Sequence, residues 1–210
     1  MQTHPNLFEY GRWFDRTFRD KPAHRSPTWR AALGIFAQRG GVTIVETGCQ
    51  RFANDWGAGC STRLLALALK ELCRGRLHSV DNSKEHLEVA KAIIHQDGTD
   101  AIVDFYLEDS IQFLQTFTSS IDLLYLDSFD YSQAEPGLSA CQGHQLNELE
   151  AAFDKLSHGA VVILDDNSLP QGGKTRLAKR FLVKRDWLCV LDWQQSVWIR
   201  STRPPTDIGV

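Results

Sequence analysis

Residues 42–62, VTIVETGCQRFANDWGAGCST, decide the fold of this chain. The run opens with β-branched and apolar residues, passes through Glu46, and carries glycines at positions 48, 57 and 59 before a helix-like segment over 61–73. A buried strand that breaks into a glycine-rich turn and then a helix is how an open α/β sheet builds a site for a nucleotide-type cofactor. Glycine lets the backbone approach a ligand, and the helix N-terminus offers free N–H groups. A glycine-rich connection without any ligand would leave the same pattern.

The composition fits one α/β domain and excludes several classes of partner. The chain has 210 residues, of which 42% are hydrophobic, enough for a substantial core. A formal net charge of −3 gives no basic field for nucleic acid or a membrane surface. Five scattered cysteines without a C-x-x-C pair predict a reducing, cytoplasmic location. Basic residues cluster only over 174–185, which we interpret as the solvated face of a helix.

The rest of the chain alternates strand and helix patterns. This alternation predicts an α/β fold with a doubly wound, Rossmann-like sheet of seven mostly parallel strands that ends in a C-terminal antiparallel hairpin. Strands are expected at 42–47, 76–81, 101–107, 121–127, 159–165, 187–192 and 196–201. Helices are expected at 26–37, 61–73, 83–96, 109–118, 144–157 and 174–185. Within a single domain, we expect residues 1–40 to form a helical arm, 41–201 the cofactor-binding part and 202–210 a loose tail.

Acids follow four of the predicted strands, at the sheet edge where such folds bind ligands. Asp81 is placed to accept both hydroxyls of a ribose, or to act as a turn residue next to a cap at Ser83. Asp109, before Ser110, is placed to accept from an adenine amino group, or to cap the helix that starts there.

Two neighbouring strand ends carry several hard oxygen ligands. Asp127 ends the fourth strand, and Asp165, Asp166 and Asn167 follow the fifth. Such a set suits Mg²⁺ or a similar hexacoordinate ion. Single acids used for turn capping or for electrostatics would give the same residues.

Taken together, these residues resemble a class I S-adenosylmethionine-dependent methyltransferase. The resemblance rests on Val-Glu-Thr-Gly at 45–48, Gly-Ala-Gly-Cys-Ser-Thr at 57–62 and the acids after the later strands, and it covers about residues 40–200. It implies S-adenosylmethionine as cofactor. For cofactor binding it implies Glu46, Gly48, Gly57 and Gly59 at the methionine end, Asp81 at the ribose and Asp109 at the adenine, together with Ser61, Ser110 and Asp127.

A finer resemblance concerns the acids after the fourth and fifth strands. Asp127, Asp166 and Asn167 are similar to the metal triad of catechol-type O-methyltransferases, in which Mg²⁺ binds two vicinal oxygens of a small-molecule substrate. This implies a divalent cation and transfer of the methyl group to oxygen. The catechol type has a lysine base three residues after its first metal acid, where this chain has Asp130. A carboxylate can serve there as a base or as another metal ligand.

His144 is a third candidate catalytic residue, besides Asp127 and Asp130, because imidazole titrates in the range that a general base needs. It shares a helical face with Glu148, opposite an apolar stripe, so a solvated first turn is the favoured interpretation. Residues 172–175, GGKT, resemble half of a P-loop but fail the full pattern, which leaves them as a candidate site for an anionic part of a substrate.

The sequence thus predicts a methyltransferase with a small-molecule acceptor, no nucleic acid and no membrane, and leaves formation of a homodimer open. Two alternatives remain: a macromolecular acceptor, and a cofactor-binding scaffold that has lost catalysis. The scaffold is disfavoured if the acids at positions 127, 130 and 166 and Asn167 converge on one open cavity.

Overall fold

The computed structural model describes residues 7–19, 21–56, 60–131 and 137–200. The expected glycines Gly57 and Gly59, and the expected tail, lie outside the described residues. A seven-stranded sheet has the order β3-β2-β1-β4-β5-β7-β6. Its strands are β1 Thr43–Thr47, β2 Arg76–Asp81, β3 Val103–Leu107, β4 Ile121–Leu126, β5 Leu156–Leu164, β6 Trp187–Asp192 and β7 Ser196–Arg200. The first five pair in parallel, whereas β7 runs antiparallel to both of its neighbours. The predicted fold class is therefore confirmed.

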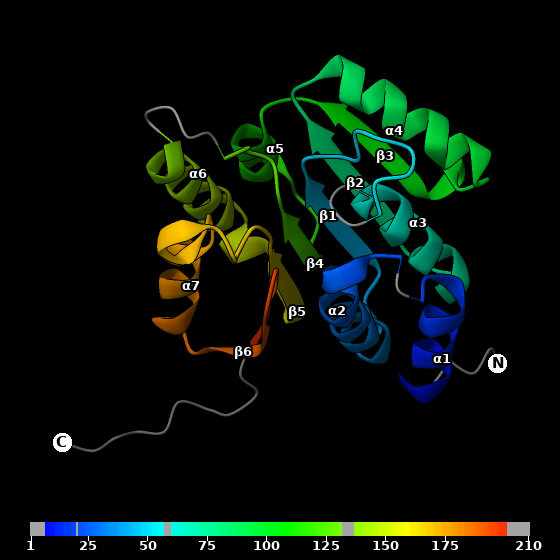
Figure 1. Ribbon diagram of the computed structural model, residues 1–210, viewed down its shortest axis with the longest axis horizontal. Helices are drawn as coiled ribbons and strands as arrows, with labels where there is room; N and C mark the ends of the chain where they lie inside the picture. The colour runs from blue at the N-terminus through cyan, green and yellow to red at the C-terminus, as the bar shows by residue number, and fades with distance from the viewer. Residues whose placement is uncertain (1–6, 20, 57–59, 132–136, 201–210) are drawn as a thin grey trace.

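Helices cover both faces of the sheet (Figure 1). They are α1 Leu7–Thr17, α2 Ser26–Gln38, α3 Ser61–Leu72, α4 Lys84–Gln96, α5 Ser110–Thr116, α6 Gly137–Ala152 and α7 Arg176–Val183. Figure 1 shows α5, α6 and α7 on the left of the sheet and α1 to α4 on the right. The chain order changes direction between β1 and β4, which makes their carboxyl ends the topological switch point. Ligands of open α/β sheets bind at that point.

Two apolar cores follow from the alternation of side chains along the buried strands. On β4, Leu123 and Tyr125 pack into the core beneath α1, α2 and α3, whereas Leu124 and Leu126 pack into the core beneath α5, α6 and α7. Such strands read as continuous apolar runs because both faces are covered. The two cores hold the strand ends rigid, so that short side chains at the edge are placed precisely.

The largest difference from the sequence prediction concerns α6, which begins at Gly137 rather than at position 144. Gly143 lies inside this helix and, with the upstream proline and glycine, gave the appearance of a loop. Cys141, Gln142 and Gln145 are buried, and their packing outweighs the helix-weakening effect of the glycine. The same helix ends early, so that β5 begins at Leu156 instead of 159.

All five cysteines are free thiols. Within the described ranges, the longest apolar helical stretch falls short of what is needed to cross a bilayer.

Candidate active site at the ends of β1, β4 and β5

The turn after β1 depends on Gly48. This residue has a φ of +80°, and a Cβ atom there would lie 2.6 Å from the backbone oxygen of Asp127 at the end of β4. Its N–H donates to the oxygen of Val80 at 2.9 Å, and the N–H of Asp127 donates to Thr47 at 3.0 Å. The ends of β1, β2 and β4 are therefore pinned to one another around a backbone that only glycine can adopt.

Glu46 lies beneath this turn rather than in it. Its side chain is fully buried, and Oε2 accepts hydrogen bonds from Thr62 at 2.8 Å and from Ser79 at 2.7 Å. Its other oxygen, Oε1, has no partner among the described residues. Burial raises the pKa of Glu46 to about 7, although the hydrogen bonds from Ser61, Ser79 and Thr62 oppose that rise. The carboxyl thus links β1, β2 and the start of α3.

A small cavity of about 40 Å³ lies on the β2 side of Gly48 and contains several predicted cofactor residues. Asp81, Asp109, Ser110 and His144 all line it. Asp81 accepts from the N–H of Cys49 at 3.1 Å, and also from the N–H of Ser83 at 2.8 Å, so it joins the glycine turn to the start of α4. Asp109 accepts from the N–H of Gln112 at 3.0 Å and is the N-cap of α5. Their predicted roles toward ribose and adenine stay predictions.

A larger cavity of about 240 Å³ lies on the other side of Gly48. Asp127, Asp130 and Asp166 line it together, as do Ser61 and Arg25. Three of the four residues expected to converge, Asp127, Asp130 and Asp166, therefore lie around one open cavity, so the arrangement that would disfavour the scaffold alternative is present in part. Asn167 does not join them.

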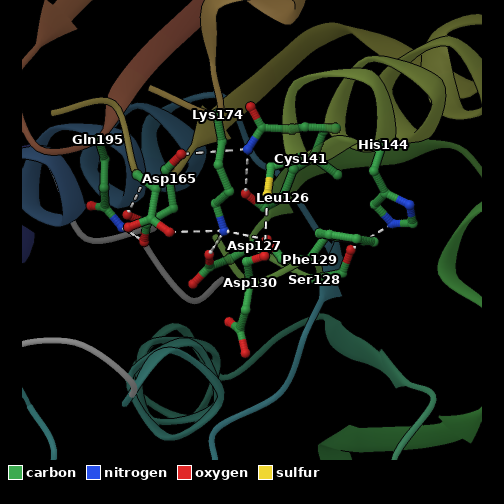
Figure 2. A network of polar contacts seen from close by, with 12 residues as sticks. Leu126, Asp127, Ser128, Phe129, Asp130, Cys141, His144, Asp165, Lys174 and Gln195 are labelled. Carbon is green, nitrogen blue, oxygen red and sulfur yellow. Dashed lines mark hydrogen bonds and ion pairs between the residues drawn. The ribbon is translucent and has the colours of Figure 1, made fainter. Parts of the chain in front are cut away.

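A buried lysine joins two of these acids. The Nζ of Lys174 lies 2.8 Å from Asp127 Oδ1, 2.8 Å from Asp166 Oδ2 and 2.9 Å from the oxygen of Phe129. Figure 2 shows this side chain reaching between the strand ends, with its nitrogen close to Asp127 and Phe129. Its side chain is 1% exposed, so the interpretation of 174–185 as a solvated face is wrong for this residue. A pattern of charges in one segment cannot reveal acids contributed by another.

The carboxylate of Asp165 is held on the other side of the same cluster. Arg25 donates to it at 3.1 Å, the hydroxyl of Tyr125 at 2.5 Å and the amide of Gln195 at 2.8 Å. Tyr125 also donates to Asp127 at 3.1 Å. Three carboxylates, at positions 127, 165 and 166, thus face two cations, Arg25 and Lys174, which leaves a formal charge of −1.

The environment of Asp127 suits proton transfer. Its side chain is 23% exposed toward the cavity. Burial raises its pKa to about 7; Lys174 opposes this rise, while Asp165 and Asp166 add to it. A carboxyl group with a pKa near neutrality can accept a proton and release it again.

Asp130 and His144 have different surroundings. Asp130 makes a bidentate ion pair with Arg51, at 2.5 and 2.8 Å. This hydrogen-bonded partner holds the pKa of Asp130 below its usual range, which makes it a weak base. His144 Nε2 lies 2.9 Å from Ser128 Oγ and 3.5 Å from Glu148 Oε1. Burial alone would lower the pKa of His144, but the hydrogen bond and charge of Glu148 outweigh it and raise the pKa.

The expectation of a solvated first turn around His144 is wrong. Because α6 starts at Gly137, His144 lies well inside the helix, and Glu148 is buried against the hydroxyl of Ser128 at 2.6 Å. Both side chains face the strand ends instead of solvent. His144 contacts the smaller cavity, whereas Asp127 contacts the larger one.

The predicted metal ligands do not fit a divalent ion. The ammonium of Lys174 lies between Asp127 and Asp166, where the ion would have to be. The amide of Asn167 faces away: it donates to Asp192 at 2.6 Å and accepts from Thr175 at 2.7 Å. Among the residues that the structure describes, no group of three His, Cys, Asp or Glu side chains could hold a metal ion.

The comparisons with known proteins agree with this geometry. A protein-family profile described as "Methyltransferase domain" matches residues 56–167, which is more than half of the chain. The chain belongs to this family of methyltransferases. The matched region begins shortly before α3 and ends in the turn after β5, so it includes Asp81, Asp109, Asp127, Asp130 and Asp166. A search of curated protein sequences gives no match.

Solved structures share the fold of this methyltransferase at low sequence identity. The SAH-bound methyltransferase PaMTH1 of Podospora anserina aligns with 94% of this chain and 88% of its own, at a TM-score of 0.61 and 15% identity. A methyltransferase from Geobacter sulfurreducens aligns with 92% of this chain and 87% of its own, at a TM-score of 0.57 and 16% identity. An rRNA methylase from Streptococcus thermophilus aligns with 77% of this chain and 87% of its own, at a TM-score of 0.52 and 10% identity. Such likenesses bear on the fold and leave the acceptor undecided.

The sequence interpretation missed Arg25, Tyr125 and Lys174. Each depends on a distant partner: Arg25 lies 140 positions from Asp165, and Lys174 lies 47 positions from Asp127. Two signals were present in the sequence. Tyr125 carries the one hydroxyl in the run of residues 123–126, LLYL, before Asp127, and Lys174 directly follows the paired glycines of GGKT.

Proposed function

We propose that this methyltransferase transfers the methyl group of S-adenosylmethionine to a hydroxyl oxygen of a small molecule, with Asp127 as the general base. The observation that carries the proposal is the carboxyl of Asp127, partly exposed in the 240 Å³ cavity beside Gly48, with a pKa raised to about 7.

In this proposal the cofactor binds on the side of the smaller cavity and the acceptor binds in the larger one. We assign the adenosyl end to Asp81, Asp109 and Ser110, whose cavity of about 40 Å³ must widen to admit an adenosine. Gly48 lines this cavity and the larger one, so the two adjoin at the turn after β1. Near the methionine end, the buried Oε1 of Glu46 has no hydrogen-bond partner among the described residues. The N-terminus of α3 lies beside it, and one amide of its first turn, that of Arg63, donates to Gln50 Oε1 at 3.2 Å. When bound, S-adenosylmethionine supplies a methyl group on a cationic sulfonium. The formal charge of −1 in the neighbouring cluster favours a cation at this edge of the sheet.

Asp127 has the chemistry that the acceptor needs. Methyl transfer is an in-line displacement, so positioning and deprotonation of the nucleophile carry most of the catalysis. A carboxylate with a pKa near 7 takes the proton of an acceptor hydroxyl at neutral pH. Asp130 is the weaker candidate, because Arg51 stabilises its charged form. His144 is the candidate base only for an acceptor in the smaller cavity.

The size and lining of the larger cavity favour a small acceptor with an apolar part. A volume of about 240 Å³ is below the usual range of about 300–1,000 Å³ for small-molecule sites, so it has room only for a small acceptor. Phe52 lines this cavity and is exposed, and Phe129 is exposed at the edge of the smaller one. Aromatic side chains at a rim offer stacking surface to a ring. The net charge of −3 gives no field that would hold a polyanionic nucleic acid.

The test is methyl transfer from labelled S-adenosylmethionine to a panel of phenols, catechols and hydroxy acids, with total RNA as a further acceptor. With an accepted small molecule, Asp127→Asn should lower kcat by about 10²-fold or more, the usual contribution of a general base, and leave the affinity for S-adenosylhomocysteine within a few-fold. The logarithm of kcat should rise with pH and level off above about 7 in the wild type only. Asp130→Asn serves as the matched control and should keep most of the rate. Methylation of RNA alone, or an unchanged rate in Asp127→Asn, would overturn the proposal.

A further inference from the structure

The ammonium of Lys174 sits in a cage of oxygen atoms that resembles a small cation site. Its three partners are Asp127 Oδ1 and Asp166 Oδ2, both at 2.8 Å, and the backbone oxygen of Phe129 at 2.9 Å. Two carboxylates and one carbonyl are hard ligands of the kind that Ca²⁺, Mn²⁺ and Mg²⁺ prefer. The cage contributes to the larger cavity through both carboxylates, whose side chains are 23% and 31% exposed, whereas the lysine itself is 1% exposed.

The backbone before Lys174 is built to deliver this side chain. Gly173 has a φ of +66°, and a Cβ atom there would collide with the backbone oxygen of Asp166, so that only glycine is tolerated. The N–H of Lys174 donates to that same oxygen at 3.1 Å. From α6, the amide of Gln142 donates to the oxygen of Gly173 at 2.8 Å. These backbone contacts hold the turn at Gly173 next to Asp166, and so they direct the side chain of Lys174 toward the acids.

The charges explain why a cation is required at this position. Asp165 is already neutralised by Arg25, with further hydrogen bonds from Tyr125 and Gln195. Asp127 and Asp166 face each other across the Nζ of Lys174 at 2.8 Å on each side, and the guanidinium of Arg25 lies 3.6 Å from Asp166. Without a cation between them, two carboxylates at this separation would repel each other and take up protons.

We propose that Lys174 is a tethered cation, whose ammonium takes the place of a divalent metal ion between the acids that end β4 and β5. In this role it is a positioning residue: it holds Asp127 and Asp166 against the cavity and does not touch the acceptor. The catalytic part of this inference rests on the proposed function, because Asp127 is the base that Lys174 positions. The occupancy of the cation position does not depend on any acceptor.

A variant without the lysine should bind a divalent ion in its place. In Lys174→Ala the three oxygen atoms remain, and a divalent ion can bind them after a small contraction, since Ca²⁺–oxygen distances are about 2.3–2.6 Å. The variant should therefore acquire a site for Ca²⁺ or Mn²⁺ that the wild type lacks. Methylammonium, which has the charge and size of the missing group, should fill the same space.

The experiment is a titration of the wild type, Lys174→Ala and Lys179→Ala with Mn²⁺. Binding is measured from the electron paramagnetic resonance signal of free Mn²⁺, and stability is measured by thermal unfolding. Lys179 is the matched control, because it is a partly buried lysine of α7 that pairs with Asp192 at 2.8 Å away from the cage. Lys174→Ala should bind Mn²⁺ at least about tenfold more tightly than the other two proteins, a difference of about 1.4 kcal/mol. Mn²⁺ or methylammonium should also raise its Tm and restore part of its activity. Equal and weak binding by all three proteins would overturn the proposal.

A second measurement uses the wild-type protein and remains available if Lys174→Ala does not fold. The wild type, dialysed against a chelator, should keep its Tm and any methyl transfer activity, and added Mn²⁺ should change neither. Loss of stability or activity on chelation, restored by Mn²⁺, would refute the tethered cation. If the variant gains Mn²⁺ binding while no small-molecule acceptor is ever methylated, the cation assignment holds and the proposed function fails.

Discussion

The burial of Glu46 beneath the glycine turn predicts a measurable dependence of stability on pH. Burial raises the pKa of Glu46 from its ordinary value of 4.5 to about 7. Below the lower value the group is protonated in both the folded and the unfolded protein, and above the upper value it is charged in both. Folding therefore becomes less favourable as the pH rises through this interval, by about 3 kcal/mol in total. Glu46→Gln cannot ionise and should lose this dependence, while its amide oxygen still accepts from Ser79 and Thr62.

The assay is urea denaturation of the wild type and Glu46→Gln between pH 4 and pH 8. The variant's stability relative to the wild type should improve by about 3 kcal/mol from the acidic to the basic end, whatever fixed cost the substitution carries. Glu150→Gln, at an exposed position of α6, controls for the loss of one carboxylate and should parallel the wild type. Parallel curves for Glu46→Gln and the wild type would mean that Glu46 is not desolvated in the folded state, contrary to its complete burial in the structure.

Three further predictions concern the rim of the site. Gly48→Ala should lower the free energy of unfolding by about 1–3 kcal/mol through backbone strain and should weaken binding of S-adenosylhomocysteine in calorimetry; an undiminished affinity would argue against the turn as the cofactor site. A double-mutant cycle on Arg51 and Asp130 should give a coupling of only about 0.2–1 kcal/mol, since Asp130 is 68% exposed, and a larger coupling would contradict this exposed geometry. His144→Gln should lower the free energy of unfolding most at acidic pH, because the pairing with Glu148 favours the imidazolium. The loss should shrink as the pH rises past the raised pKa of His144 in the folded state. Urea denaturation at pH 5 and pH 8 measures this change, and an equal loss at both pH values would mean that the pair does not form.

The fold could be predicted from the sequence because its strands are buried on both faces. The runs that end at Asp127 and Asp165 are nearly continuous in apolar residues, and this pattern places their acids at one sheet edge without further information. The limits of α6 could not be predicted in the same way. Its first turns are held by packing of Cys141 and Gln142, which is a tertiary effect, whereas the local sequence contains a glycine at 143.

The acids of the candidate site could be predicted from the sequence, whereas its cations could not. Strand ends follow from local pattern, so Asp127 and Asp166 could be placed together. Their partner Lys174 comes from a different connection, and its burial follows only from the three-dimensional path of the turn at Gly173. A lysine surrounded by other basic residues in the sequence is ordinarily solvated. The acids alone indicate a metal site, whereas the structure places the ammonium of Lys174 between Asp127 and Asp166.

The central claim is that the strand ends around Gly48 bind the adenosyl cofactor of a methyltransferase. The most direct measurement is isothermal titration calorimetry of the wild-type protein with S-adenosylhomocysteine. We expect saturable binding of one molecule per chain, weakened in Asp81→Ala because that carboxylate lines the smaller cavity and accepts a hydrogen bond from the turn after β1. Absence of binding at millimolar S-adenosylhomocysteine, in a protein that unfolds cooperatively and is therefore folded, would contradict it.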